Sequence, residues 1–79
     1  MCIEDTWGSD VTTAAALHLA AATAPAALLN TCDLSGYVAP RIAPAGPTRQ
    51  DGRIAPPEGP GLGVAPDLAV LGEPCAVYG

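Results

Sequence analysis

The feature that most constrains the fold is a polar stretch, residues 4–10, that follows an apolar stub of only three residues. This pattern is typical of a loop at the carboxyl end of a β-strand that leads into a helix, here capped by Ser9 or Asp10. In α/β proteins such loops bind ligands, because the strands behind them are buried and the loops are free to carry polar groups. A buried strand normally has about 5 to 6 residues, so the sequence predicts a strand that is cut short at its amino end.

Length and composition predict a small core. The chain has 79 residues, 49% of them apolar, and alanine supplies the largest share, with one Trp and no Phe. Ordering each residue costs about 1 to 2 kcal/mol, whereas even a fully buried large aliphatic side chain contributes only about 1.5 to 3 kcal/mol. Nine Gly and nine Pro, concentrated after Gly36, limit regular structure there. We therefore expect the isolated chain to be unstable, or stable only against a partner.

Charge excludes several classes of partner. Eight acidic residues against three arginines give a net charge of −5, which argues against nucleic-acid binding because that requires a basic surface. The apolar run over residues 14–29 contains His18 and Pro25, and it is too short and too interrupted to span a membrane. The acidic amino terminus lacks the pattern of a signal peptide. These observations predict a cytoplasmic protein, and the absence of lysine limits its catalytic roles.

The cysteines predict neither a disulfide framework nor a metal site. Cys2, Cys32 and Cys75 are odd in number and far apart, unlike the cysteines of small secreted proteins. Together with His18 they nominally supply a Cys3His zinc site, but no two of the four have the short spacing that such sites use. Buried free thiols are the favoured interpretation, and no metal-ligating set is predicted.

Residues 11–23 are predicted to form a helix, because alanine and leucine have high helix propensity and no Gly or Pro interrupts them. One face carries residues at i, i+3, i+4 and i+7, namely Ala14, Leu17, His18 and Ala21. His18 lies about two turns inside this helix, away from the polar loop. A packing or surface histidine is therefore favoured over a ligand or a base. Pro25 ends the helix, because it disfavours helical geometry at the preceding residue.

Residues 26–33 form a short apolar run that becomes polar, which predicts a buried parallel strand with Asp33 at its carboxyl end. Strand, helix and strand then make one βαβ unit with a right-handed crossover. This topology places Asp33 on the same edge as the loop over residues 4–10. A binding site is expected where the two polar stretches meet.

The second half of the chain predicts short, irregular elements. Residues 50–54 contain Asp51-Gly52, a pair that favours positive φ, and indicate a turn that enters a short strand. Gly61 and Gly63 suggest a phosphate loop, but no strand precedes them and no third Gly or Lys-Ser/Thr follows. Residues 66–71 predict a short helix with Pro66 at N1, Asp67 near the helix dipole and Gly72 at C′. Residues 75–78 are predicted to be a final strand.

The order and spacing of several motifs are more specific than any one of them. The motifs are residues 4–10, 13–20 and 33–34, and then 51–54, 60–64, 66–67 and 71–74. Together they resemble the carboxyl-terminal part of the mandelate racemase and muconate lactonizing enzyme group of the enolase superfamily. The resemblance covers nearly the whole chain. It implies an α/β fold, a carboxyl-terminal fragment of a modified TIM barrel. Residues 1–35 would be the seventh strand, seventh helix and eighth strand, and residues 36–79 a Pro/Gly-rich tail whose short strands return to the capping domain.

The resemblance also implies a reaction for the parent enzyme. Members of the group remove the proton α to a carboxylate with a Lys or His base and stabilise the enediolate on Mg²⁺. Their metal ligands lie on the third to fifth strands and their lysines on the second and often the sixth, all of which would precede this chain. A homo-oligomeric parent with racemase, epimerase or dehydratase activity is implied, and we expect this chain alone to be inactive.

The resemblance further implies where a substrate would bind. Asp33 matches an acid at the end of the eighth strand that contacts the substrate amine or supports the transition state; a cap or a solvated turn is the alternative. Trp7 either covers an ammonium group through a cation–π contact of about 0.5 to 2 kcal/mol or packs the helix onto the barrel rim. Thr6 and Asp5 complete the predicted substrate-binding set. Glu4 and Asp5 point to opposite faces, and the pattern does not assign which faces the helix.

An acid and an aromatic side chain at one mouth suit a zwitterionic substrate such as a proline or hydroxyproline derivative. Two other hypotheses stay open. In the first, the chain is a small polypeptide that binds a partner through its apolar helix and proline-rich tail. In the second, it is a non-functional gene remnant. The DNA upstream of the Met1 codon separates these hypotheses, because only the fragment hypothesis requires lysine-bearing barrel strands in the same reading frame.

Overall fold

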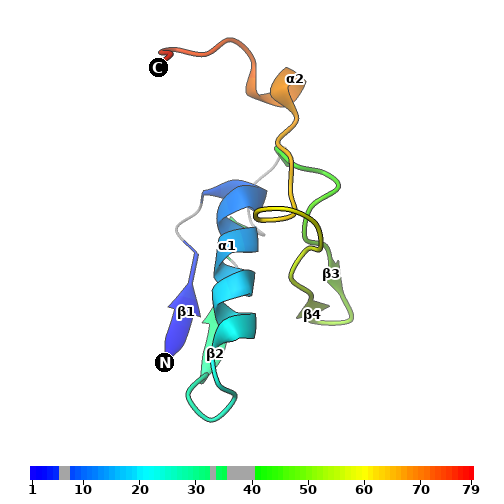
Figure 1. Ribbon diagram of the computed structural model, residues 1–79. Coiled ribbons are helices and arrows are strands. Elements are labelled where there is room, and N and C mark those ends of the chain that lie inside the picture. The colour runs from blue at the N-terminus through cyan, green and yellow to red at the C-terminus, as the bar shows by residue number, and fades with distance from the viewer. Residues whose placement is uncertain (6–7, 33, 36–40) are drawn as a thin grey trace.

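A computed structural model of the chain describes residues 1–5, 8–32, 34–35 and 41–79 (Figure 1). Along the chain, the helices and strands are β1 (Cys2–Glu4), α1 (Ser9–Ala22), β2 (Asn30–Cys32), β3 (Arg49–Gln50), β4 (Arg53–Ile54) and α2 (Leu68–Leu71). The predicted order of strand, helix and strand in the first half is confirmed. Across the part of the chain that is described, no helix has the length and apolar character needed to cross a membrane.

β1 and β2 pair in parallel, and α1 lies alongside both strands (Figure 1). Ile3 is paired with Thr31 at the centre of this short ladder and is buried. Ala14 and Leu17 of α1 are also buried, as expected for a helix face that covers a sheet. The neighbouring residues of β1, Cys2 and Glu4, are exposed because alternate side chains of a strand point to opposite faces. The sheet therefore has one covered and one uncovered face.

The predicted strand over residues 26–33 is wrong in its first half. The amide nitrogens of Ala27 and Leu28 donate to the carbonyl oxygen of Ala24 over 2.8 and 3.2 Å, which closes a turn after α1. β2 consequently begins only at Asn30. Leu29, an apolar residue of the predicted buried run, has 81% of its surface exposed.

Helix α1 ends as predicted but begins differently. At its carboxyl end the amide nitrogen of Thr23 donates to the carbonyl oxygen of Ala20. At its amino end Gly8 is the N-cap residue and no side chain caps the helix. The prediction that Ser9 or Asp10 caps α1 is therefore wrong, and the carboxylate of Asp10 binds residues of the tail instead.

The face expected on α1 is confirmed only near its amino end. Ala14 and Leu17 are buried, whereas His18 is half-buried and Ala21 is exposed. His18 is held by the tail, with Nε2 lying 3.0 Å from the carbonyl oxygen of Leu62. This contact agrees with the favoured interpretation of His18 as a packing residue.

β3 and β4 form an antiparallel hairpin in which Arg49 faces Ile54 and Gln50 faces Arg53. The two loop residues, Asp51 and Gly52, have φ of 52° and 73°. Positive φ at both positions is what a type I′ turn requires, and its twist suits a tight hairpin. The predicted turn into a short strand is confirmed, and β3 is an additional strand.

The end of the tail departs from prediction in two places. Asp67 is the N-cap of α2, where its Oδ1 accepts a hydrogen bond of 3.0 Å from the amide nitrogen of Ala69, so Pro66 lies before the helix and not at N1. Gly72 follows the helix with a φ of 76°, as predicted for a glycine at C′. Residues 75–78 form no strand, because among the described residues none pairs with them and all four are exposed. The prediction of a final strand is wrong.

The core is small, as the composition predicted. The buried apolar residues of the described chain are Ile3, Ala14, Ala16, Leu17 and Ala43. Ala43 comes from the tail, and the backbone beside it is tied further along the chain by a bond of 2.5 Å from the amide of Asp67 to the carbonyl oxygen of Ile42. Among these core residues only Ala43 belongs to the tail, and the tail is attached to α1 also by polar contacts of Asp10 and His18.

Candidate functional site

The carboxyl ends of β1 and β2 lie side by side, because Glu4 pairs with Cys32 at the end of the ladder. Asp5 follows β1, and its carboxylate accepts hydrogen bonds from the chain that follows β2. The amide nitrogen of Leu34 donates to Oδ1 over 3.0 Å, and that of Ser35 donates to Oδ2 over 3.1 Å. The two polar stretches thus meet at one edge of the sheet, as the predicted topology requires.

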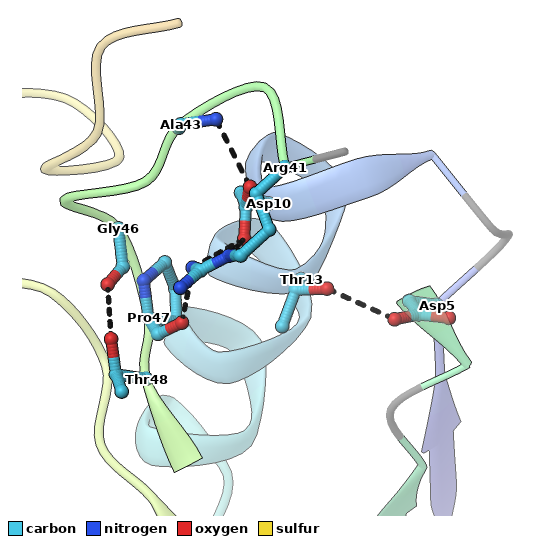
Figure 2. Close-up of polar contacts among 8 residues, drawn as sticks. All are labelled: Asp5, Asp10, Thr13, Arg41, Ala43, Gly46, Pro47 and Thr48. Carbon is cyan, nitrogen blue, oxygen red and sulfur yellow. Dashed lines mark hydrogen bonds and ion pairs between the residues drawn. The ribbon is translucent and has the colours of Figure 1, made fainter. Parts of the chain in front are cut away.

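Four residues were predicted to bind a substrate at this edge. Thr6, Trp7 and Asp33 lie outside the described residues. Asp5 is described and is only 3% exposed, and a third hydrogen bond of 3.0 Å reaches its Oδ2 from the hydroxyl of Thr13 on α1 (Figure 2). Of the two alternating acids, Asp5 therefore faces the helix and Glu4 the uncovered face. The carboxylate of Asp5 holds β1, α1 and the segment after β2 together, and its contact with a substrate stays a prediction.

These hydrogen bonds determine the protonation state of Asp5. Burial by itself raises the pKa of the carboxyl group, because the charged form loses solvation. The hydrogen bonds from the amide of Ser35, the hydroxyl of Thr13 and the amide of Leu34 stabilise the charged form and outweigh burial, so that the pKa lies below its usual value of 3.8. Asp5 is a carboxylate at neutral pH, which suits an anchor and not a general acid.

A second carboxylate, that of Asp10, holds the tail against α1 (Figure 2). Nε and Nη2 of Arg41 both donate to its Oδ1, over 3.0 and 2.6 Å, and the amide nitrogen of Ala43 donates to Oδ2 over 3.0 Å. Nη2 of Arg41 also donates to the carbonyl oxygen of Pro47 over 2.7 Å. The sequence analysis missed this cluster because Asp10 and Arg41 are 31 residues apart and nothing local links them.

The pKa of Asp10 is also lowered. Burial raises it, and the guanidinium of Arg41 together with the amide of Ala43 lowers it by more. The side chain of Asp10 is only 10% exposed. Solvent and salt therefore screen its attraction to Arg41 less than they would screen an exposed ion pair.

Acid is expected to destabilise the fold through both carboxylates. A group with a lowered pKa in the folded state contributes stability above its unfolded pKa, about 3.9, and that stability is lost as the pH falls through the folded value. The free energy of unfolding should therefore be constant between about pH 7 and pH 5 and should fall below about pH 4. Urea unfolding at pH 7, 5 and 3 measures this, and a stability that rises on acidification would contradict the prediction.

A third polar cluster lies on the uncovered face of the β1–β2 sheet. Oε1 of Glu4 is 4.0 Å from Sγ of Cys2 and 3.8 Å from Sγ of Cys32, and Oδ1 of Asn30 is 2.5 Å from Sγ of Cys2. Partial burial, the thiol of Cys2 and the carboxylate of Glu4 all raise the pKa of Cys32. The three cysteines are free thiols, as expected, but the prediction that they are buried is wrong, since Cys2 and Cys75 are exposed and Cys32 is half-buried.

A hollow of about 700 Å³ lies beside the β3–β4 hairpin. It is lined by Thr48, Gln50, Asp51, Arg53, Ile54 and Ala55. None of the four predicted substrate-binding residues lines it, so it does not coincide with the predicted site.

Comparison with known proteins places this arrangement in a family. The chain is 45% identical over 78 residues to cis-3-hydroxy-L-proline dehydratase from Roseibium aggregatum, which covers 99% of this chain and 21% of that protein. It superimposes with a TM-score of 0.82 and 41% identity on a crystal structure of a mandelate racemase/muconate lactonizing enzyme from Roseovarius nubinhibens, covering 95% of this chain and 20% of that one. The chain thus spans about a fifth of the length of these relatives. Since the family model described as enolase C-terminal domain-like matches residues 1–70, the chain belongs to that family.

Proposed function

We propose that this chain is the carboxyl-terminal segment of an enolase-superfamily enzyme that removes the proton α to the carboxylate of a proline- or hydroxyproline-like amino acid. In this proposal β1, α1 and β2 are the last strand–helix–strand unit of a modified TIM barrel, and the tail returns to the capping domain. The observation that carries it is the 45% identity to a cis-3-hydroxy-L-proline dehydratase along almost the whole chain. That relative favours dehydration over racemisation or epimerisation.

We call the carboxyl ends of β1 and β2, with Asp5 and residues 33–35 that follow them, the mouth. Its contacts support different roles for its residues. Asp5 makes three hydrogen bonds and is buried, so it acts as a positioning residue for the loops after β1 and β2. Asp33 follows β2 directly, and we propose that its carboxylate binds the substrate amine. Trp7 and Thr6, which follow Asp5 along the chain, would complete the substrate contacts.

Dehydration of such a substrate is a β-elimination. A base takes the proton from the carbon that bears the carboxylate, and the hydroxyl group on the neighbouring carbon leaves as water, so that a carbon–carbon double bond forms between them. This chain contains no lysine, and its one histidine binds the carbonyl oxygen of Leu62. We therefore propose that the base comes from outside the 79 residues.

The residues that the structure describes do not supply a site that fits the Mg²⁺ implied by the family. Mg²⁺ prefers oxygen ligands in an octahedral arrangement. Within the described ranges, the one group of three potential ligands consists of Cys2, Glu4 and Cys32, and two of those donors are sulfur. We propose that the Mg²⁺ ligands, like the base, lie outside this chain and that the chain alone is inactive.

The proposal is tested by comparing the 79-residue chain with a longer protein translated from the same reading frame with its upstream codons. Each is incubated in D₂O with Mg²⁺ and cis-3-hydroxy-L-proline and followed by NMR. We expect the longer protein to eliminate water and the short chain to leave the substrate unchanged. Deuterium incorporation at the α carbon with retention of the hydroxyl would indicate epimerisation or racemisation instead. Turnover by the short chain would contradict the argument that essential groups are missing.

The role of Asp33 is tested in the longer protein. Asp33→Asn removes the charge that would bind the amine and should raise KM about 10- to 100-fold, the range for a hydrogen bond to a charged group. Glu73→Gln is the matched control, because Glu73 is an exposed carboxylate of the tail. An unchanged KM in Asp33→Asn would contradict the assignment.

A second candidate function, partner binding, is favoured by one observation. Large apolar side chains of α2 and the last residues are uncovered, including Leu68 at 73% and Tyr78 at 93% exposure. Either the remainder of a longer enzyme or a separate partner would cover them. If the reading frame does not continue upstream into lysine-bearing strands, a partner is expected, and circular dichroism should show helix content rising on mixing. A gene remnant would show neither activity nor such a gain.

A further inference from the structure

We propose that Cys2, Cys32 and Glu4, with Asn30 beside them, form a binding site for a thiophilic divalent cation, Zn²⁺, on the uncovered face of the β1–β2 sheet. Its side chains lie on the face of the two strands opposite to Asp5 and α1, and Glu4 and Cys32 stand at the carboxyl ends of those strands. Its side chains come from two strands that are 25 residues or more apart in sequence, so their spacing along the chain does not reveal it.

Strand register brings the donors together. Cys2 and Glu4 are two residues apart on β1 and therefore point to the same face. Their partners on β2 are Asn30 and Cys32. Four side chains with sulfur or oxygen donors thus occupy neighbouring positions on one face. The two sulfur atoms and one oxygen of Glu4 all lie within 4.8 Å of one another.

The spacing of these atoms matches a tetrahedral zinc site. Zn–S bonds of about 2.3 Å and Zn–O bonds of about 2.0 to 2.2 Å at tetrahedral angles put neighbouring ligand atoms roughly 3.5 to 3.8 Å apart. Oε1 of Glu4 lies 3.8 Å from Sγ of Cys32 and 4.0 Å from Sγ of Cys2. Completing the geometry with Asn30 requires a side-chain movement of about 1 Å, because its Oδ1 lies 2.5 Å from Sγ of Cys2. Oδ1 of Asn30 or a water molecule would supply the fourth ligand.

Electrostatics also favour a cation here. The carboxylate of Glu4 places a negative charge beside both thiols. A divalent cation would pair with this charge and replace the thiol protons. Binding should therefore release protons and become tighter as the pH rises.

A disulfide between the same cysteines fits the register less well. Cys2 is paired with Asn30 and Cys32 with Glu4, so the two cysteines are diagonal neighbours. Directly paired residues lie closest across two strands, diagonal neighbours lie farther apart, and a disulfide requires Cα atoms closer than about 7 Å. In the structure both cysteines are free thiols, and Oε1 of Glu4 lies within 4.0 Å of each sulfur atom, which favours coordination.

The test is a titration of the reduced 79-residue chain with Co²⁺, a spectroscopic substitute for Zn²⁺, followed by displacement with Zn²⁺. We expect one ion per chain, a thiolate-to-cobalt charge-transfer band, and loss of that band as Zn²⁺ is added. Cys2→Ser and Cys32→Ser should each weaken binding about 100-fold, at least as much as the loss of an outer-shell partner of a metal. Cys75→Ser is the matched control, since Cys75 is an exposed thiol outside the cluster, and it should bind as the unchanged chain does.

Circular dichroism in the same titration separates site formation from binding by an unfolded chain. Helix content that is present throughout, or that appears as the ion is added, supports the proposal, because ion binding is then coupled to the folded arrangement of the strands. The proposal is overturned by absence of the charge-transfer band, by an equal loss of affinity in Cys75→Ser and Cys2→Ser, or by unchanged binding in concentrated urea.

Discussion

Replacing Asp10 with asparagine is expected to lower the free energy of unfolding by about 2 to 4 kcal/mol, the range for losing charge-assisted hydrogen bonds in a partly buried ion pair. The carboxylate of Asp10 accepts two hydrogen bonds from Arg41 and one from the amide of Ala43. An asparagine side chain of the same shape has one acceptor oxygen, so its NH₂ group would face one of these donors. The guanidinium would also remain without its counter-charge.

The loss should be visible first in the tail. Urea unfolding followed by circular dichroism measures stability, and hydrogen exchange at the amide of Ala43 reports the local contact. Asp51→Asn is the matched control, because Asp51 is exposed and a type I′ turn accepts asparagine. If Asp10→Asn and Asp51→Asn unfold at the same urea concentration, the contact with Arg41 does not hold the tail.

Asp5→Asn is expected to cost about 2 to 3 kcal/mol, because three donors, Thr13, Leu34 and Ser35, share one carboxylate that is almost fully buried. The amide of an asparagine can satisfy at most two of them through its oxygen and would oppose the third with its own donors. Amide exchange at Leu34 and Ser35 should accelerate, whereas exchange at Ala43 should not. Faster exchange at Leu34 and Ser35 alone would show that the hydrogen bonds of Asp5 are lost. Faster exchange at Ala43 as well would show a general loss of stability.

In the longer protein the same substitution should reduce kcat/KM, because Asp5 positions the loops that carry the proposed substrate contacts. A reduction in activity without faster exchange at Leu34 and Ser35 would instead indicate that Asp5 contacts the substrate directly, as the sequence predicted. Unchanged activity and unchanged exchange would contradict both roles.

Local elements were predictable where neighbouring residues alone decide them. Helix α1 follows from a run of alanine and leucine that Pro25 stops, and the turn at Asp51-Gly52 follows from the ease with which these residues adopt positive φ. The motif order also identified the family that the comparisons then established. Two predictions failed because a competing contact was not local. Asp10 was expected to cap α1 but binds Arg41, and residues 75–78 were expected to be a strand but have no strand partner among the described residues.

The candidate site was also predictable only in part. The parallel pairing of two strands around a helix was predicted, and it brings the ends of β1 and β2 together. Which of Glu4 and Asp5 faces the helix was not predictable, because alternation along a strand assigns opposite faces without naming them. The structure decided this through the hydroxyl of Thr13, which binds Asp5.

By itself, the sequence determined the family, the βαβ order and the shortage of core, since these depend on composition and on patterns a few residues long. The tertiary structure alone decided which side chains meet. Strand register placed Cys2 beside Cys32, and packing of the tail placed Arg41 on Asp10. These contacts join residues about 30 positions apart, and the physical reason that sequence does not reveal them is that each is set by the way separate elements pack.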